Sequence, residues 1–271
     1  MTSPWTSDLS VAEFDVLGAV GFRPVGQVMG TSVYQIGYAG TNYCGGGGRW
    51  GGGGSPTPTR AGPLIDALYD ARFKALSRMQ AEAGAVGADG VVGVELTIRP
   101  FPAQQQAVEF SAIGTAVRAD GGAHPPRPFL SDVSGQDFVK LLLSGWVPTG
   151  IAMGVCVLVR HDDWNTRRQA GSWVNVEVSG YTDAVQGSRK GAREALAADV
   201  HRLGGEGVVV RDMTLRVHEQ ECLTFGSNSG RDHVAEATVL GTAITRFRNT
   251  SEAAAPRTLP ILRLGTNRTE L

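Results

Sequence analysis

The feature that most constrains the fold of this chain is an internal repeat. The segment GFRPVGQVMGTSV at 21–33 returns as GWVPTGIAMGVCV at 145–157, with glycine, proline and methionine at the same places. Two further blocks also occur twice, in the same order along the chain: 87–96 with 204–213, and 107–117 with 234–244. The three blocks keep the same order, and only the lengths of the segments between them differ, which indicates duplication of one structural unit. A chain of 271 residues is long enough for two domains, each with its own core.

The repeat defines the expected domain organisation. Between the copies lies the Gly/Pro-rich stretch ADGGAHPPRPFLSDVSGQ, whose composition is typical of a linker. After Arg246 the chain becomes polar and Ala-rich. The predicted parts are the first repeat, a linker, the second repeat and a flexible C-terminal tail: 11–119, 120–135, 136–247 and 248–271.

Each repeat contains one amphipathic helix with apolar residues at helical spacing. The two stripes are Leu68, Ala75, Met79, Ala83 and Val86, and Val185, Ala192, Leu196, Val200 and Leu203. One apolar face implies an opposite face in water, so we expect these cations to be largely exposed: Arg72, Lys74, Arg78, Arg189, Lys190 and Arg193. Pro63 suits the first turn of the first helix, and Gly87 and Gly204 suit C-terminal caps with positive φ.

Strands follow each helix. Val92, Val94, Leu96 and Ile98 alternate with more polar neighbours, which is the period of a strand with one buried face. The blocks ending GTAVR and GTAIT are rich in β-branched residues and are interpreted as further strands. The predicted fold class is α+β: a tandem duplication of a small two-layer α/β sandwich, with one main helix on a short, mainly antiparallel sheet.

Composition excludes several classes of partner. The formal net charge is −1, which gives no bulk attraction for nucleic acid or anionic lipid. The stretch from Leu141 to Val159 carries no charge and approaches membrane-spanning length. It contains Pro148 and several glycines, so we interpret it as a buried strand–turn–strand and expect no membrane insertion. Three widely spaced cysteines and no signal-peptide pattern predict a reducing cytoplasmic location.

The turn and strand motifs resemble the YbjQ-like family, which carries a heavy-metal-binding label. The residues are GADGVVG at 87–93, after an Ala-rich helix, and GTAV at 114–117, together with Met29-Gly30. The resemblance covers about residues 13–118 well and 137–246 more loosely, as a second copy. It implies a small α/β sandwich that assembles into homopentameric rings, with no established reaction.

One set of residues is a candidate metal site for a divalent transition metal. His218 and Cys222 follow an expected strand, and His233 begins the next one, so all three could meet across a hairpin. The competing interpretation is an exposed hairpin with scattered polar residues, since the first repeat has no ligand set at 102–106. The cluster at 161–163, His-Asp-Asp, is a second set of possible ligands at the end of an apolar strand.

No catalytic constellation is present in the sequence patterns. There is no GxSxG or HExxH motif and no cysteine with an activating neighbour, so we predict a protein that is not an enzyme. Asp89 and Glu206 occupy matching turns, where a carboxylate that accepts backbone N–H groups is the favoured interpretation. The Gly-rich segment 44–56 lacks the Gly-Lys-Ser/Thr ending of a phosphate loop and is predicted to be a flexible surface loop.

The function predicted from these observations is a non-enzymatic, ring-forming oligomeric scaffold. Two-domain chains cannot alternate evenly around a five-membered ring, so we expect a homopentamer with two stacked rings, one of each repeat. A heavy-metal-binding or small-ligand-binding protein is the alternative. The apolar run Leu259–Leu264 in the tail is expected to fold back on the ring, to dock a protein partner, or to be a disordered end.

Overall fold

The structure is a computed structural model, and the residues it describes are 7–35, 57–104, 107–121, 124–221 and 231–247. The Gly-rich segment, Cys222 and the C-terminal tail with its apolar run lie outside the described residues.

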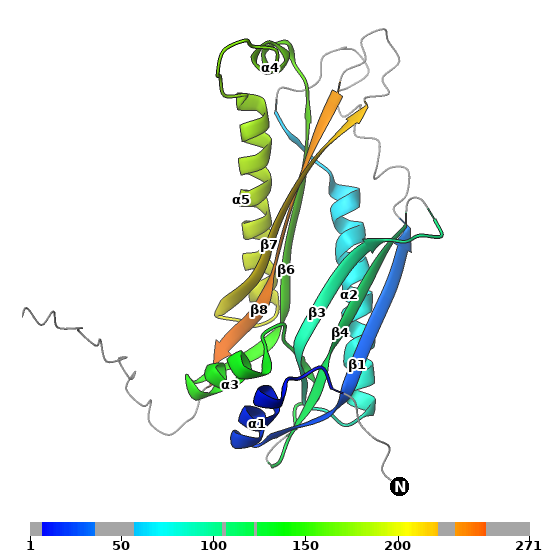
Figure 1. The fold of residues 1–271 in the computed structure, drawn as a ribbon, viewed down its shortest axis with the longest axis vertical. Helices are drawn as coiled ribbons and strands as arrows, with labels where there is room; N and C mark the ends of the chain where they lie inside the picture. The colour runs from blue at the N-terminus through cyan, green and yellow to red at the C-terminus, as the bar shows by residue number, and fades with distance from the viewer. Residues whose placement is uncertain (1–6, 36–56, 105–106, 122–123, 222–230, 248–271) are drawn as a thin grey trace, which may run out of the picture.

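Two four-stranded sheets, each with a long helix on it, make up the described chain (Figure 1). The first half contains α1 (Val11–Ala19), β1 (Phe22–Gln35), β2 (Thr59–Arg60), α2 (Gly62–Ala85), β3 (Gly90–Pro100) and β4 (Ala107–Ala119). The second half begins with β5 (Phe129–Leu130) and continues with α3 (Gly135–Leu143), β6 (Trp146–His161), α4 (Trp164–Ala170), α5 (Ser179–Arg202), β7 (Gly207–Glu221) and β8 (Arg231–Arg246).

The two halves share one order of elements: short helix, long strand, long helix, strand and strand. The short helices α1 and α3 each have 9 residues, and the long helices α2 and α5 each have 24. The sheet orders are β1-β4-β3-β5 and β2-β6-β8-β7, and every strand pair is antiparallel except β3 with β5. The predicted α+β class is therefore confirmed.

Local signals set the ends of the helices. Ser10 and Glu13 form a capping box at the start of α1, and the Ser134 hydroxyl accepts a hydrogen bond from Asp137 N at the start of α3. Gly87 and Gly204 have φ of 72° after α2 and α5, as predicted.

The uncharged stretch from Leu141 to Val159 is not a strand–turn–strand, so that prediction was wrong. It contains the last turn of α3, a turn at Gly145 with φ of 79°, and most of β6. The error arose because α3 is a short helix whose start signal, Ser134, precedes the apolar run. None of the helices in the described part of the chain is long and apolar enough to cross a membrane.

Each long helix packs unusually closely on its own sheet because a glycine faces it. A Cβ at Gly30 would lie 2.0 Å from Ala75 O of α2, and a Cβ at Gly154 would lie 1.9 Å from Ala192 O of α5. No side chain fits at either position, so the helix backbone rests directly on the strand.

The halves exchange elements. Strand β2 precedes α2 yet pairs with β6 of the second half, and β5 precedes α3 yet pairs with β3 of the first half. The region expected to be a linker at 120–135 therefore includes a strand and the start of a helix. Helix α2 lies between the two sheets (Figure 1).

Candidate assembly interface

The contact between the halves is built on the edge of β6. This strand pairs with β8 along one side, but on the other side, within the described residues, β2 pairs with Val159 and Leu158 alone. An uncovered strand edge presents unpaired N–H and C=O groups that invite another chain. Side chains from both long helices occupy this edge instead.

Tyr69 and Arg72 of α2 replace the missing strand. The Tyr69 hydroxyl donates to Met153 O and accepts from Val155 N, each at 3.1 Å. Arg72 donates from Nη2 to Ile151 O at 2.6 Å. Burial raises the pKa of Tyr69, so its hydroxyl keeps the proton that it donates. The first half thus satisfies backbone groups of the second half.

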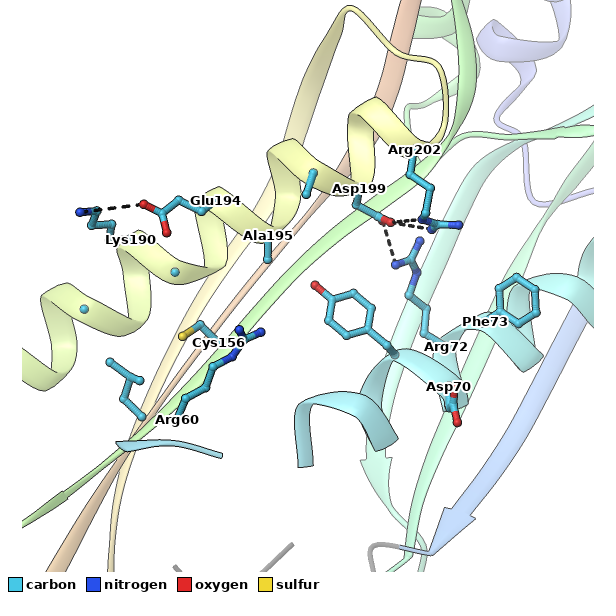
Figure 2. Close-up of a pocket in the computed structure, with 15 residues that line it drawn as sticks. Arg60, Asp70, Arg72, Phe73, Cys156, Lys190, Glu194, Ala195, Asp199 and Arg202 are labelled. Carbon is cyan, nitrogen blue, oxygen red and sulfur yellow. Dashed lines mark hydrogen bonds and ion pairs between the residues drawn. The ribbon is translucent and has the colours of Figure 1, made fainter. Parts of the chain in front are cut away.

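Asp199 of α5 joins the same cluster, and Figure 2 shows Arg72 and Arg202 converging on it. Its Oδ2 accepts from Arg72 Nη1 at 3.0 Å and from Met153 N at 2.9 Å, while Oδ1 accepts from Arg202 Nε at 2.9 Å. Burial opposes ionisation of Asp199, but Arg72, the Met153 amide and Arg202 outweigh it and hold the pKa of the carboxyl below its usual value. The carboxylate is therefore a charged, fully partnered link between α2, α5 and β6.

The expected exposure of Arg72 was wrong, since the residue is 5% exposed. The apolar stripe in the sequence shows only which face of the helix packs on the sheet of its own half. Helix α2 has a second buried face, because the sheet of the second half covers it. Arg72 Nε is buried there without a hydrogen-bond partner, which marks the cost of placing a guanidinium in this contact.

An apolar seam completes the contact. Alternate side chains of β6 point away from α5 and pack against α2, and all are at most 6% exposed: Ile151, Met153, Val155, Val157 and Val159. Ile65, Leu68 and Ala71 of α2 meet them. Burying such side chains stabilises by about 1.5–3 kcal/mol each, so the seam is a substantial part of the core.

A groove of about 890 Å³ opens between α2 and α5 beside the covered edge (Figure 2). Its lining mixes cations with acids: Arg60, Lys190 and Arg202 with Asp70, Glu194 and Asp199. Cys156 also lines the groove, but burial raises the pKa of its thiol, which disfavours the nucleophilic thiolate. The groove offers space for a small polar ligand rather than an assembled catalytic set.

The structure separates two of the predicted metal ligands. His218 pairs with Val234 and His233 pairs with Glu219 on the neighbouring strand. Directly paired residues share a face and successive residues alternate, so the two imidazoles lie on opposite faces of the sheet. With Cys222 outside the described residues, the proposed trio as a whole stays a prediction.

His233 is instead part of a buried polar network. Its Nε2 lies 2.8 Å from the Tyr181 hydroxyl and 3.2 Å from Asp162 Oδ1. Burial and the neighbouring Asp162 raise the pKa of Tyr181 to about 12, so the phenol remains protonated. The sequence treated His233 and Asp162 as parts of separate clusters, whereas the pairing of β6 with β8 brings them together.

The other residues of the 161–163 cluster have different partners. His161 Nδ1 lies 2.7 Å from Asp232 Oδ1, and Asp163 caps α4 by accepting from Thr166 N. Among the residues that the structure describes, no group of three or more His, Cys, Asp or Glu side chains is arranged to hold a metal ion. Asp89 accepts from Ala119 N at 2.8 Å, which confirms its interpretation as a turn carboxylate.

Comparison with known proteins places this chain in a family. Over 236 residues the chain is 38% identical to the encapsulin nanocompartment protein Rv1762c of Mycobacterium tuberculosis, covering 82% of this chain and 84% of that protein. The chain belongs to the same family as this nanocompartment protein. Since the aligned region spans most of both chains, both halves are included in the likeness.

A family model described as "Putative heavy-metal-binding", YbjQ_1, matches residues 58–120. These residues include β2, α2, β3 and β4, so the match covers most of the first half but neither α1 nor β1. The predicted resemblance to this family is confirmed for that segment. The matched segment also contains Tyr69 and Arg72, the two α2 side chains that reach the second half.

Proposed function

We propose that this chain is a non-enzymatic subunit of a homo-oligomeric scaffold, built from two diverged YbjQ-like domains, at about 11–119 and 136–247, in neighbouring places of a closed ring. The shared element order and matching helix lengths support the duplication. The relative that bears the name of a nanocompartment protein supports an assembled structural role.

The observation that carries the proposal is a difference between equivalent strands. On β6 the side chains facing away from the sheet's own helix are covered by α2, with Met153 0% and Val157 0% exposed. The same positions on β1 are Met29 and Val33, and each is 50% exposed. The first half therefore presents the surface that the second half has already covered.

The contact between the halves uses different surfaces on each side. The first half contributes the outer side of α2, and the second half contributes the outer face of β6. Among the described residues, the complementary pair of surfaces is uncovered, namely the outer face of β1 and the outer side of α5. A contact between unlike surfaces repeats from chain to chain and either closes a ring or continues as a filament.

We propose that this repeating contact closes a ring, which is a pentamer of two-domain chains. Because the halves already meet through the contact that would repeat, the ring has the halves alternating around a single circle of ten domains. This arrangement replaces the two stacked rings expected from sequence, in which copies of the same half would meet. A cytoplasmic assembly with no nucleic acid or membrane partner remains part of the proposal, as does a role for the C-terminal tail in docking or fold-back.

Metal or small-ligand binding is the alternative function. The heavy-metal-binding description of the matching family supports it, and the groove between α2 and α5 supplies a place for a small ligand. Metal analysis of the purified chain separates the alternatives. A stoichiometric bound metal that is required for assembly would shift the assignment towards this second function.

Native mass spectrometry tests the main proposal. At micromolar concentration we expect one dominant species with the mass of five chains. A monomer under these conditions would refute the scaffold. A single closed species of another size would keep the scaffold and correct the pentamer.

A further inference from the structure

We propose that residues 173–178 and the outer side of α5 bind the edge of β1 in a second copy of this chain. The inference rests on the proposed function and specifies which residues form the contact between chains. It is drawn from the contact that the two halves already make, because the corresponding elements, β1 of the first half and α5 of the second half, present exposed surfaces.

The internal contact supplies the template. Thr59 and Arg60, just before α2, pair with Val159 and Leu158 on β6, and Ala61 N donates to Val157 O at 3.0 Å. The residues ahead of α2 thus add a short strand to the second sheet before the helix begins.

The residues ahead of α5 join no such strand in the described part of the chain. Val176 and Glu177 hold the places of Thr59 and Arg60, at the same distance from the helix start, but belong to no strand. The segment is apolar and exposed: Trp173 is 103%, Val174 74% and Val176 48% exposed. Three large apolar side chains in water directly before a helix indicate a surface that another chain covers.

The matching acceptor is the outer edge of β1, which no described strand covers. Two side chains of α2 reach this edge: Arg78 donates to Thr31 O, and Glu82 accepts from Met29 N. Among the residues that the structure describes, strand β1 lies at the end of its sheet and pairs with β4 alone. Gln35 and Tyr34 hold the places of Val159 and Leu158 on β6. Repetition of the internal contact therefore pairs Val176 with Gln35, and Glu177 with Tyr34, of the neighbouring chain.

The charged cluster has a counterpart as well. Met29 N donates to Glu82 at 3.1 Å, just as Met153 N donates to Asp199 at 2.9 Å. Glu82 is therefore the equivalent of Asp199. The equivalent of Arg72 is Arg189, which is exposed on the outer side of α5.

Arg189 consequently pairs with Glu82 of the neighbouring chain and donates to Gln27 O there, as Arg72 does with Asp199 and Ile151 O. Gln186 holds the place of Tyr69. Its side-chain amide carries both a donor and an acceptor, so it can replace the hydroxyl that bridges Met153 O and Val155 N. The partners on β1 are Met29 O and Thr31 N.

This contact is more polar than its template, because Thr31 lies where the seam has Val155 and Gln186 lies where α2 has Tyr69. Arg189 and Glu82 are both exposed in the separate chain, so salt screens their attraction as two chains meet. We therefore expect chains to associate reversibly, more weakly at high ionic strength, whereas the two halves of one chain stay in contact.

Cysteine cross-linking tests the strand pairing. Residues directly opposite in an antiparallel pair have Cα atoms about 4.5–5.5 Å apart, which suits a disulfide. We expect the full chain with Gln35→Cys and Val176→Cys, on a Cys44→Ser and Cys222→Ser background, to form a ladder beyond dimers on oxidation. The control pair Glu95→Cys and Val176→Cys should form no ladder, because Glu95 is on β3, which lies two strands away from β1 in the sheet.

The outcomes separate the two proposals. If the wild-type chain assembles and the first pair gives no ladder, the strand pairing is wrong while the scaffold stands. If the wild-type chain is monomeric, the proposed function as a scaffold is refuted.

Charge reversal tests the helix contact independently. Arg189→Glu and Glu82→Arg should each weaken assembly roughly 10- to 100-fold, and the double variant should recover most of the loss. Lys190→Glu makes the same charge change on α5 at the place of Phe73, outside the inferred contact, and should leave assembly within about twofold. Equal effects of Lys190→Glu and Arg189→Glu, or no recovery in the double variant, would overturn the assignment of this pair.

Discussion

Replacing Arg72 by methionine examines the contact between the halves most sharply. The side chain makes two strong interactions: an ion pair with Asp199 at 3.0 Å and a hydrogen bond to Ile151 O at 2.6 Å. The side chain of Asp199 is only 7% exposed. Methionine keeps the length and apolar stem of the residue, so the change removes the charge and the donors with little loss of volume.

The expected loss follows from what stays behind. Removing one partner of a buried ion pair costs about 3–5 kcal/mol, because an unpaired charge remains buried. The orphaned Ile151 carbonyl adds about 1–3 kcal/mol. Arg202 and the Met153 amide still bind Asp199 and offset part of this, so we expect a total loss of about 3–5 kcal/mol.

Urea unfolding at pH 7 and fixed protein concentration measures this loss. The control Lys190→Met removes an exposed cation from α5 and should change stability by less than about 0.5 kcal/mol. Adding Asp199→Asn to Arg72→Met should restore part of the loss, since the amide still accepts from Met153 N without a buried charge. A loss below about 1 kcal/mol, or no recovery in the double variant, would refute the role assigned to this pair.

Three further predictions concern packing and pH. Gly154→Ala should destabilise the fold by about 1–3 kcal/mol or more, because the added Cβ would meet Ala192 O. Gly26→Ala is the control, since the space around Gly26 is open, and it should not destabilise the fold. Thermal unfolding measures both variants. Met79→Ala should cost about 2–5 kcal/mol since the side chain is 0% exposed, and an equal cost for the exposed Val86→Ala would contradict the packing. The pKa of Asp199 is lowered in the folded chain, so its ionisation stabilises the fold above about pH 3.9, the pKa of an unfolded Asp. This stabilisation is lost as the pH falls through the folded pKa. The drop in unfolding free energy between pH 7 and a pH below 4 should therefore be larger for wild type than for Asp199→Asn.

Features governed by local sequence were predicted well. The buried stripe from Leu68 to Ala83 and the positive φ of Gly87 each depend on a few neighbouring residues, and the structure confirms them. Val86, the predicted last member of the stripe, is 46% exposed because it is the C-cap residue after α2, so that part of the prediction was wrong. The terminal strand with GTAV likewise follows from its β-branched residues and is β4. These features are visible from sequence because their causes lie within a turn or a strand.

Features governed by the contact between halves were not predicted. Arg72 looks like a surface cation until a second sheet is placed on α2, and Phe129 looks like linker until it pairs beside Gly90 of β3. The one available signal was the repeat itself: Tyr69 and Leu76 on α2 are more apolar than Gln186 and Arg193 on α5. That difference marks the helix whose outer side is covered within the chain.

The separated histidines show the same limit. His218 and His233 looked adjacent across a hairpin, but adjacency in sequence does not set the face on which a side chain lies. The register of β7 with β8 does so, and it places the two on opposite faces. Periodicity within one strand cannot reveal that register, because it depends on the partner strand.

Cryo-electron microscopy of the assembled wild-type chain tests the central claim most directly. We expect a closed ring in which the first and second halves alternate, with α5 of each chain packed on β1 of the next as α2 packs on β6. A particle made of two stacked rings, each containing only one kind of half, would contradict it. So would a twofold dimer in which β1 meets β1.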